Sequence, residues 1–181
     1  MFKLKLTEDF FVIIGDAIFD IDFNRMVDYH RAKGGLVTLF THPNSHPYDS
    51  GVVIADKDGI VQSWLNKEDK RPLYYKNRVN AGIQLLSPKA LEMSGIDAEL
   101  VGTEVEGRIL KVDMDRQILR PLCGTGKMFC YDSPEYVKDM GTPERFHQVE
   151  KDFIRGTIKA KSLRNKQKAI FLDRDGTINH Y

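Results

Sequence analysis

The feature that most constrains the fold is a short apolar run, Phe11–Ile14, that stops abruptly at Gly15-Asp16. Four consecutive apolar residues, rich in β-branched and aromatic types, indicate a fully buried strand of a parallel sheet. Ligands of open α/β sheets bind beyond the carboxyl ends of the strands, so Asp16 is expected where a substrate would lie. Its carboxylate could hold Mg2+, a cation that prefers oxygen ligands. A plain strand-ending turn explains the same Gly-Asp pair about equally well, and this stretch alone leaves both interpretations open.

The composition is that of an ordinary soluble globular chain. Its 181 residues are 41% hydrophobic and 29% charged and carry a net charge of +1, which suits one domain with a core, or one domain and a piece of another. So small a net charge gives no reason to expect nucleic acid or a membrane surface as a partner. Cys123 and Cys130 form no CxxC pair or zinc pattern, and no apolar run approaches the length of a membrane span. We therefore expect a cytoplasmic protein with reduced thiols; a homo-oligomer remains open.

The following segments predict strands and helices in alternation. Helical spacing after Asp22, stopped by Gly34-Gly35, predicts a helix, and Leu36–Thr41 predicts a second buried strand. This strand–helix–strand order predicts a parallel pair with a right-handed crossover. Further patterns predict a hairpin over 52–64, a strand over 79–86, a helix opened by Ser87-Pro88, a helix capped by Asp113 and a short strand over 127–131. Gly82 inside a strand often marks the close approach of another backbone or a ligand.

Two later segments are candidates for phosphate chemistry, and the sequence supports only the second of them. Gly124–Lys127 is similar to a phosphate-binding loop, but the earlier glycine and the metal-binding Ser or Thr are absent, which favours a plain turn. Asp139 is a better candidate. Thr142 is a good N-cap with Pro143 in the first helical position, so Asp139 lies in the turn just before a helix. It is the second carboxylate in a site-like position.

The character of the chain changes after residue 155. Lys and Arg dominate residues 156–167, which predicts a basic linker, and 168–179 predicts a fresh buried strand that ends in the D-x-D-G-T motif of Asp173 and Asp175. A lone strand cannot bury its faces, so we expect the opening of a second α/β domain. The predicted organisation is a main domain over 1–155, a linker over 156–167 and the start of a second domain over 168–181.

Four motifs within residues 10–153 resemble those of the sugar-phosphate nucleotidyltransferases. They are Ile14-Gly15-Asp16, His42-Pro43-Asn44 with His46–Ser50, Val79–Ile83, and Lys138–Arg145. The set is most similar to the heptose 1-phosphate guanylyltransferases, the branch that makes GDP-D-glycero-α-D-manno-heptose. Residues 168–179 resemble the first motif of haloacid-dehalogenase-like phosphatases, in the form found in histidinol-phosphate and heptose-bisphosphate phosphatases. The order of the two resembles a bifunctional heptose enzyme that serves consecutive steps.

The resemblance implies a Rossmann-like, GT-A-like mixed sheet flanked by helices, and an activity. A phosphate oxygen of a sugar 1-phosphate attacks the α-phosphorus of a nucleoside triphosphate, GTP in this branch, and pyrophosphate leaves. Asp16 and Asp139 are implied to hold Mg2+. The implied substrate-binding residues are Gly15, Gly51, Lys67, Asn80 and Gly82, with Lys67 at the sugar phosphate, although Asn66 stands where the family often has glutamate. In the phosphatase motif, Asp173 would be the metal-binding nucleophile and Asp175 the general acid/base, also at the metal.

The chain also departs from the family pattern. Residues 1–15 contain no glycine-rich loop of the G-G-x-G-T-R-L form, so we expect the fold to lack its N-terminal nucleotide-binding unit and this stretch to be inactive alone. The later phosphatase motifs are also missing from the sequence. Three alternatives stay open: a mannose- or glucose-1-phosphate nucleotidyltransferase, a phosphatase with a non-catalytic sugar-phosphate-binding module, and a catalytically dead binding or oligomerising module.

Overall fold

The computed structural model describes residues 6–44, 50–96, 104–105, 108–109, 111–166, 168, 170–174 and 177–178. The chain divides into two compact units. The first consists of Met1–Ala17 and Phe23–Pro134, and the second of Ile18–Asp22 and Glu135–Tyr181. Each unit has a core of its own and is described separately.

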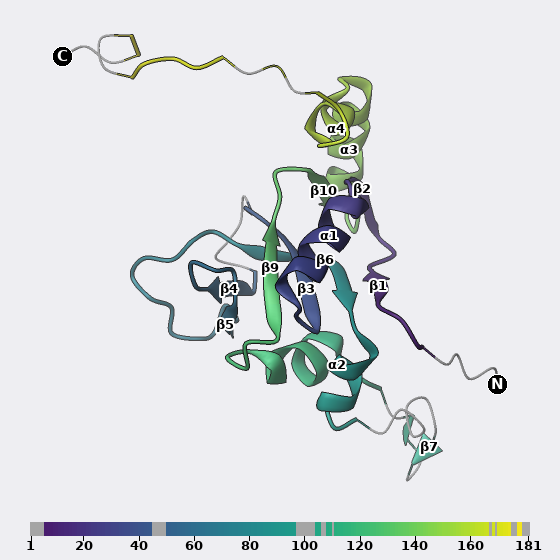
Figure 1. The fold of residues 1–181 in the computed structure, drawn as a ribbon. Helices are drawn as coiled ribbons and strands as arrows, with labels where there is room; N and C mark the ends of the chain where they lie inside the picture. Colours follow the sequence, from purple (N-terminus) through teal and green to yellow (C-terminus); the bar gives the residue numbers. More distant parts are fainter. Residues whose placement is uncertain are drawn as a thin grey trace. The chain divides into compact units, whose positions relative to one another are not determined.

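The first unit is built on a six-stranded sheet in which β6 is the central strand (Figure 1). The strand order is β5-β4-β6-β3-β9, and β1 pairs with β6 beside β4. The strands are β1 (Phe10–Ile13), β3 (Val37–His42), β4 (Val52–Ala55), β5 (Val61–Leu65), β6 (Val79–Leu86) and β9 (Met128–Asp132). β3 and β9 are parallel, whereas β6 is antiparallel to β1, β3 and β4. The sheet is therefore mixed, as the family resemblance implies.

The prediction for β1 was wrong in two respects. β1 pairs only with β6 among the described residues, and it does so in the antiparallel sense. It is not fully buried either, because Ile13 and Ile14 are 39% and 40% exposed. A continuous apolar run indicates a strand that is covered on both faces of its sheet, whereas β1 has one neighbouring strand in the described part of the chain and its apolar run ends in exposed residues. β1 and β3 do run in the same direction, since both are antiparallel to β6, but β6 separates them.

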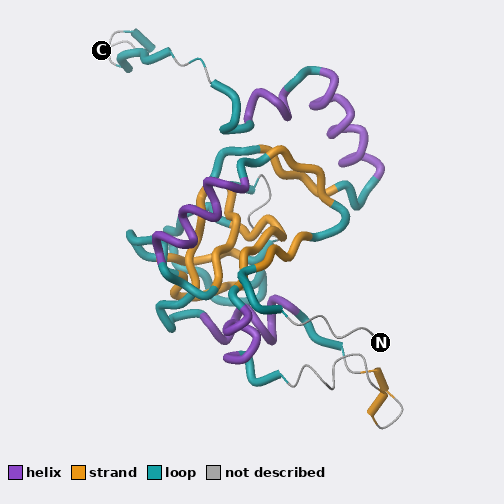
Figure 2. The backbone as a smooth tube through the Cα atoms, turned by 45° about the vertical axis from the view of Figure 1, so that its right-hand side comes forward, coloured by secondary structure: helices purple, strands orange, loops and turns teal. Residues whose placement is uncertain are grey.

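Helices flank this sheet in the first unit (Figure 2). α1 (Phe23–Lys33) packs against β3 and β9, with Met26 fully buried and the Tyr29 ring 5.3 Å from that of Tyr131. The main core includes Leu39, Leu86 and Met128 of the sheet and Leu119 of the other helical segments. Those segments are α2 (Pro88–Met93), the π-helical turn η1 (Met114–Leu119) and the 3-10 turn η2 (Arg120–Leu122); two short strands, β7 (Glu104–Val105) and β8 (Arg108–Ile109), pair with each other.

Several local predictions for the first unit are confirmed. α1 stops before Gly34, which has a φ of +63°, and Asp113 caps η1 by accepting a hydrogen bond from the amide of Arg116. Gly124 and Gly126 have φ of +74° and +73° and form the turn into β9, so the segment similar to a phosphate loop is indeed a turn. No described helix of the chain is both long and apolar enough to cross a membrane.

The second unit is smaller and is held together around Glu135. It contains β2 (Ala17–Asp20), which pairs with β10 (Tyr136–Asp139), and the helices α3 (Pro143–Ile154) and α4 (Thr157–Lys161). Thr142 caps α3 as predicted, by accepting from the amide of Arg145. The Glu135 side chain is only 3% exposed and its Oε1 accepts from the amides of Asp22, at 2.8 Å, and Leu163, at 2.9 Å. One carboxylate thereby joins three separate segments of the chain.

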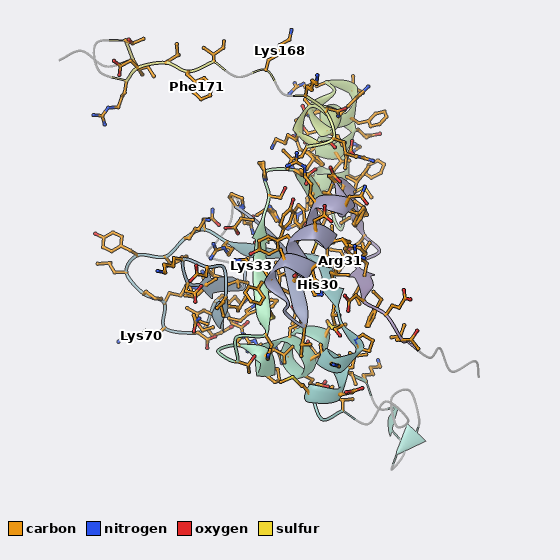
Figure 3. All side chains as sticks on the ribbon, in the orientation of Figure 1. His30, Arg31, Lys33, Lys70, Lys168 and Phe171 are labelled. Atoms are coloured by element: carbon orange, nitrogen blue, oxygen red, sulfur yellow. The ribbon has the colours of Figure 1, made fainter. Side chains whose placement is uncertain are left out.

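The C-terminal predictions differ from the structure. Where the sequence suggests a linker, Thr157–Lys161 forms α4, and Ile158 and Ser162 are buried. The helical spacing of Ile158 and Ser162 was not recognised in the sequence because lysines lie between them. The predicted strand over 168–179 is absent from its described residues, and Phe171 is 96% exposed (Figure 3). An apolar run forms a strand only where another strand pairs with it, and none of the described strands does.

Replacement of Glu135 by alanine should destabilise the second unit by about 2 kcal/mol, because two part-buried amides lose their acceptor. Glu135→Gln keeps an oxygen acceptor and should cost less. Hydrogen exchange at the Asp22 and Leu163 amides, with thermal denaturation, measures the effect. Glu150→Ala, an exposed position on α3, is the control. Unchanged protection of both amides in Glu135→Ala would contradict this role.

Candidate functional site

Asp16 lies two residues after the last hydrogen bond between its strand and the sheet. The amide of Ile14 donates to the carbonyl of Gly82 on β6 at 3.0 Å, and Gly15 and Asp16 then form an exposed turn. The predicted position, at the carboxyl end of a strand, is therefore correct, although the strand is an edge strand. An exposed carboxylate held near the end of a sheet is accessible to a metal ion or a cationic group.

Three of the predicted substrate-side residues gather at one end of the sheet. Val52 of β4 pairs with Val79 of β6 in antiparallel register, which places Gly51 beside Asn80. A Cβ on Gly51 would lie 2.5 Å from Nε1 of Trp64, so the backbone there is closely packed against the indole. Lys67 follows β5 in an exposed turn and forms only a loose ion pair with Glu68, at 3.9 Å.

Arg71 anchors the loop that carries Lys67. Its guanidinium donates to the carbonyl of Ser50 at 2.6 Å and to that of Asn66 at 3.3 Å. Because Ser50 adjoins Gly51 and Asn66 adjoins Lys67, one side chain connects the two predicted substrate-side positions. Most of the remaining loop is solvent-exposed, and Lys70 projects away from the sheet (Figure 3).

A polar cluster at the same end of the sheet was missed in the sequence. Arg78 binds both carboxylate oxygens of Asp132, at 2.7 and 2.6 Å, while Lys76 and Thr41 donate to them as well. Thr41 pairs with Asn80 on one side and with Asp132 on the other. The cluster thus continues the row from Gly51 and Asn80 across the sheet. The rule that strand ends carry sites could have found it, since Asp132 ends β9 and Arg78 immediately precedes β6.

The electrostatics of this cluster are those of a tightly held carboxylate. Burial by itself would raise the pKa of Asp132, but the hydrogen bonds from Arg78, Lys76 and Thr41 outweigh it and hold the pKa well below its usual range. Two cations surround one anion, so the cluster keeps a net charge of +1. Arg78 is 7% exposed, whereas the Lys76 side chain is 64% exposed. Lys76 is therefore the member that a ligand can reach.

In the second unit, Asp139 lies shortly before α3 as predicted, but it is the last residue of the strand β10 and not part of a turn. Its Oδ1 accepts from Arg145 and, at 3.4 Å, from the amide of Gly141. Asp139 therefore forms an ion pair with Arg145, which belongs to the same Lys138–Arg145 motif. Its oxygens are suitable ligands for a hard cation, which would compete with Arg145 for them.

The remaining candidate residues do not form a site among the described residues. Asp173 is exposed and in no strand, and Asp175 lies outside the described residues, as do residues 46–49 of the motif His46–Ser50. No group of three or more His, Cys, Asp or Glu residues placed to hold a metal occurs in the described part of the chain. Asp16 and Asp139 still offer the oxygen donors that Mg2+ prefers.

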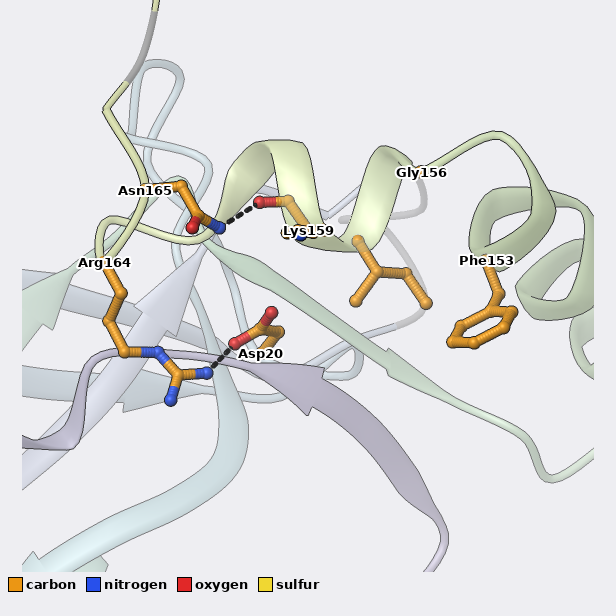
Figure 4. Close-up of a pocket in the computed structure, with 7 residues that line it drawn as sticks. Asp20, Phe153, Gly156, Lys159, Arg164 and Asn165 are labelled. Carbon is orange, nitrogen blue, oxygen red and sulfur yellow. Dashed lines mark hydrogen bonds and ion pairs between the residues drawn. The ribbon is translucent and has the colours of Figure 1, made fainter.

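The second unit also contains an open cavity of about 490 Å3 that involves none of the predicted residues (Figure 4). Phe153 and Ile158 form its apolar wall, and an ion pair between Arg164 and Asp20 borders it. Asn165 donates to the carbonyl of Lys159 at 2.7 Å and so closes the end of α4.

The Asp132 cluster should make the first unit sensitive to acid. A carboxyl whose pKa is lowered on folding adds stability above its unfolded pKa, near 3.8, and this contribution is lost as the pH falls toward the folded pKa. The free energy of unfolding should therefore fall below about pH 4, and less steeply in Arg78→Met, which is already weaker at pH 7. Urea unfolding between about pH 5 and 2 measures both slopes. Arg116→Met, from an exposed pair, should keep the wild-type slope; an unchanged slope in Arg78→Met would contradict the assignment.

Similarity to known proteins agrees with these features. Residues 2–155 match the Nucleotidyl transferase family. A mannose-1-phosphate guanylyltransferase catalytic subunit beta from Drosophila pseudoobscura pseudoobscura is 29% identical over 161 residues, which cover 88% of this chain and 37% of the relative. A mannose-1-phosphate guanyltransferase from Saccharomyces cerevisiae is 25% identical over 165 residues, 86% of this chain and 39% of the relative. The chain thus spans less than two fifths of the length of these curated relatives.

Solved structures show the same fold at low sequence identity. HddC from Yersinia pseudotuberculosis superposes with a TM-score of 0.60 at 18% identity, over 81% of this chain and 56% of that one. A Bacillus anthracis protein assigned as a glucose-1-phosphate thymidylyltransferase gives 0.56 at 17% identity, over 80% and 54%. The mixed sheet, its flanking helices and the match over residues 2–155 together place this chain in the Nucleotidyl transferase family.

Proposed function

We propose that this chain supplies the sugar-phosphate side of a nucleotidyltransferase that transfers a guanylyl group from GTP to a sugar 1-phosphate. The observation that carries the proposal is the row of Gly51, Asn80, Thr41 and Asp132 across the end of the sheet, in a chain of this family. The proposed substrates are GTP and D-glycero-α-D-manno-heptose 1-phosphate. The curated relatives favour mannose 1-phosphate as the alternative.

The chemistry requires that two anions approach each other. At about 4 Å, in an effective dielectric near 20, each pair of unit charges repels by roughly 4 kcal/mol. A bound Mg2+ would offset this repulsion and stabilise the charge of the transferred phosphoryl group. We propose Asp16 and Asp139 as the protein ligands of this Mg2+. The ion pair between Arg145 and Asp139 would then break when the metal binds.

In this proposal, the lysines of the chain bind the phosphate of the substrate, and Asn80 binds its sugar. Lys67, in its exposed turn, binds the sugar phosphate, with Lys76 adding a second positive charge from the Asp132 cluster. Asn80 uses its Oδ1 to accept from the Gly82 amide at 3.3 Å, which leaves its Nδ2 donors for a sugar hydroxyl. Gly15 lets the substrate approach the backbone, because a side chain there would meet nothing within 4 Å, whereas Gly51 makes room for the Trp64 indole beside the proposed sugar site.

A second activity is proposed for the C-terminal segment on its sequence motif alone. The D-x-D-G-T motif that contains Asp173 and Asp175 resembles the start of a haloacid-dehalogenase-like phosphatase. We propose that the complete protein joins a sugar-bisphosphate phosphatase to the transferase. Hydrolysis of a heptose bisphosphate by the complete natural protein, abolished in Asp173→Asn, tests it; full hydrolysis in that variant would exclude it.

The transferase proposal is tested by pyrophosphate release from the complete natural protein. GTP with heptose 1-phosphate should be the best pair among GTP, ATP and dTTP with heptose, mannose and glucose 1-phosphates. Asp16→Asn and Asp139→Asn should each lower the rate roughly 100-fold or more, since each removes a metal ligand. Asp28→Asn, an exposed carboxylate of α1, is the matched control and should be unaffected. Full activity in the Asp16→Asn/Asp139→Asn double variant would contradict the proposal.

A further inference from the structure

Gly82 occupies a special place in the central strand of the first unit. Its φ is +73°, a conformation that side chains disfavour. It lies at a register shift between β6 and β3, because Leu39 pairs with Gln84 whereas Thr41, two residues on, pairs with Asn80, four residues back. The extra residues on β6 form a bulge, and such bulges commonly redirect groups next to active sites.

Both backbone polar groups of Gly82 are already used inside the protein. Its carbonyl accepts from the amide of Ile14 at 3.0 Å, and its own amide donates to Oδ1 of Asn80 at 3.3 Å. The amide proton of Gly82 is therefore already engaged inside the protein, and its carbonyl holds the end of β1 while keeping a second lone pair. The sugar-binding role that the family resemblance implies for Gly82 stays a proposal, and these internal bonds give Gly82 a second, structural task.

The space above Gly82 is filled by Ile14. A Cβ at position 82 would lie 2.6, 2.7 and 2.8 Å from Cδ1, Cγ2 and Cγ1 of Ile14. Two of these atoms are bonded directly to Cβ of Ile14, and a β-branched residue has few rotamers to escape into. Any side chain at position 82 would therefore displace Ile14 itself, and with it the turn that begins at the next residue.

We propose that Gly82 is a positioning residue that seats Ile14 and thereby fixes the Gly15-Asp16 turn. β1 is an edge strand, so the hydrogen bond from Ile14 to Gly82 and the packing of Ile14 on Gly82 are its last attachments before Asp16. The bulge opens the space that this seat needs. The consequence for catalysis rests on the proposed function, in which Asp16 is a metal ligand. The packing of Ile14 on Gly82 does not depend on that function.

The chain offers a matched control for the test. Gly126 has the same φ of +73°, but a Cβ there would meet nothing within 4 Å. Gly126→Ala thus introduces the backbone strain alone, whereas Gly82→Ala introduces the strain and the clash. Ile14→Ala removes the clashing side chain, so the pair Ile14→Ala and Gly82→Ala forms a double-mutant cycle.

The kinetic test uses the complete natural protein at varied Mg2+. Gly82→Ala should lower kcat about tenfold and raise the Mg2+ concentration needed for half-maximal rate, with KM for the sugar 1-phosphate unchanged. Ile14→Ala/Gly82→Ala should recover much of this loss, and Gly126→Ala should behave as wild type. A raised sugar KM with no recovery in the double variant would overturn the inference and return Gly82 to the sugar pocket.

A second measurement does not depend on catalysis. In 1H–15N spectra of this chain, Gly82→Ala should shift the Gly15 and Asp16 amides, and the double variant should move them back toward their wild-type positions. Unshifted Gly15 and Asp16 amides in Gly82→Ala would refute the proposal that Gly82 positions Ile14. If the amides respond as expected while Asp16→Asn leaves activity intact, the seat stands and the proposed function fails. If Gly82→Ala does not fold, the Ile14→Ala/Gly82→Ala double variant should still fold because the clashing side chain is gone, and its failure to fold would overturn the proposal.

Discussion

The structure of the first unit depends on the pairing of one strand, β6. It is antiparallel to β3 along one side, while β4 and β1 share the other side at its two ends. This arrangement brings together residues that are far apart in the sequence: Ile14 just after β1, Gly51 before β4 and Thr41 of β3. Without it, neither the Asp16 turn nor the row of polar residues at the end of the sheet would have a fixed position.

Electrostatics support the proposal that this end of the sheet binds an anion. Two cations without an anion would be costly to place beside a buried strand. A cluster without net charge, in turn, would not attract an anion. Asp132 binds both Arg78 and Lys76, so the buried guanidinium is compensated while one net positive charge remains near the surface. Because these hydrogen bonds keep the pKa of Asp132 low, the arrangement persists across the neutral range.

Local chemistry made much of the fold predictable from sequence. Gly34 after α1, Asp113 before η1 and Thr142 before α3 mark boundaries through backbone conformation and capping, which act over a few residues. Strand partners depend on contacts distant in sequence, and the apolar run at Phe11–Ile14 therefore suggested burial between strands instead of an edge. α4 was missed because its buried face consists of little more than Ile158, among lysines that suggest a linker.

The candidate site was predictable in part for the same reason. Asp16 follows a strand and Asp139 ends one, so motifs at strand ends made both of them candidates, whereas Arg78 and Asp132 are 54 residues apart and carry no motif. The central claim, that Asp16 and Asp139 hold one metal ion, is tested most directly by crystals of the complete protein grown with Mn2+ and a sugar 1-phosphate. Anomalous scattering should show one peak within about 2.3 Å of both carboxylates. A peak bound to only one of them, or to neither, would contradict the account.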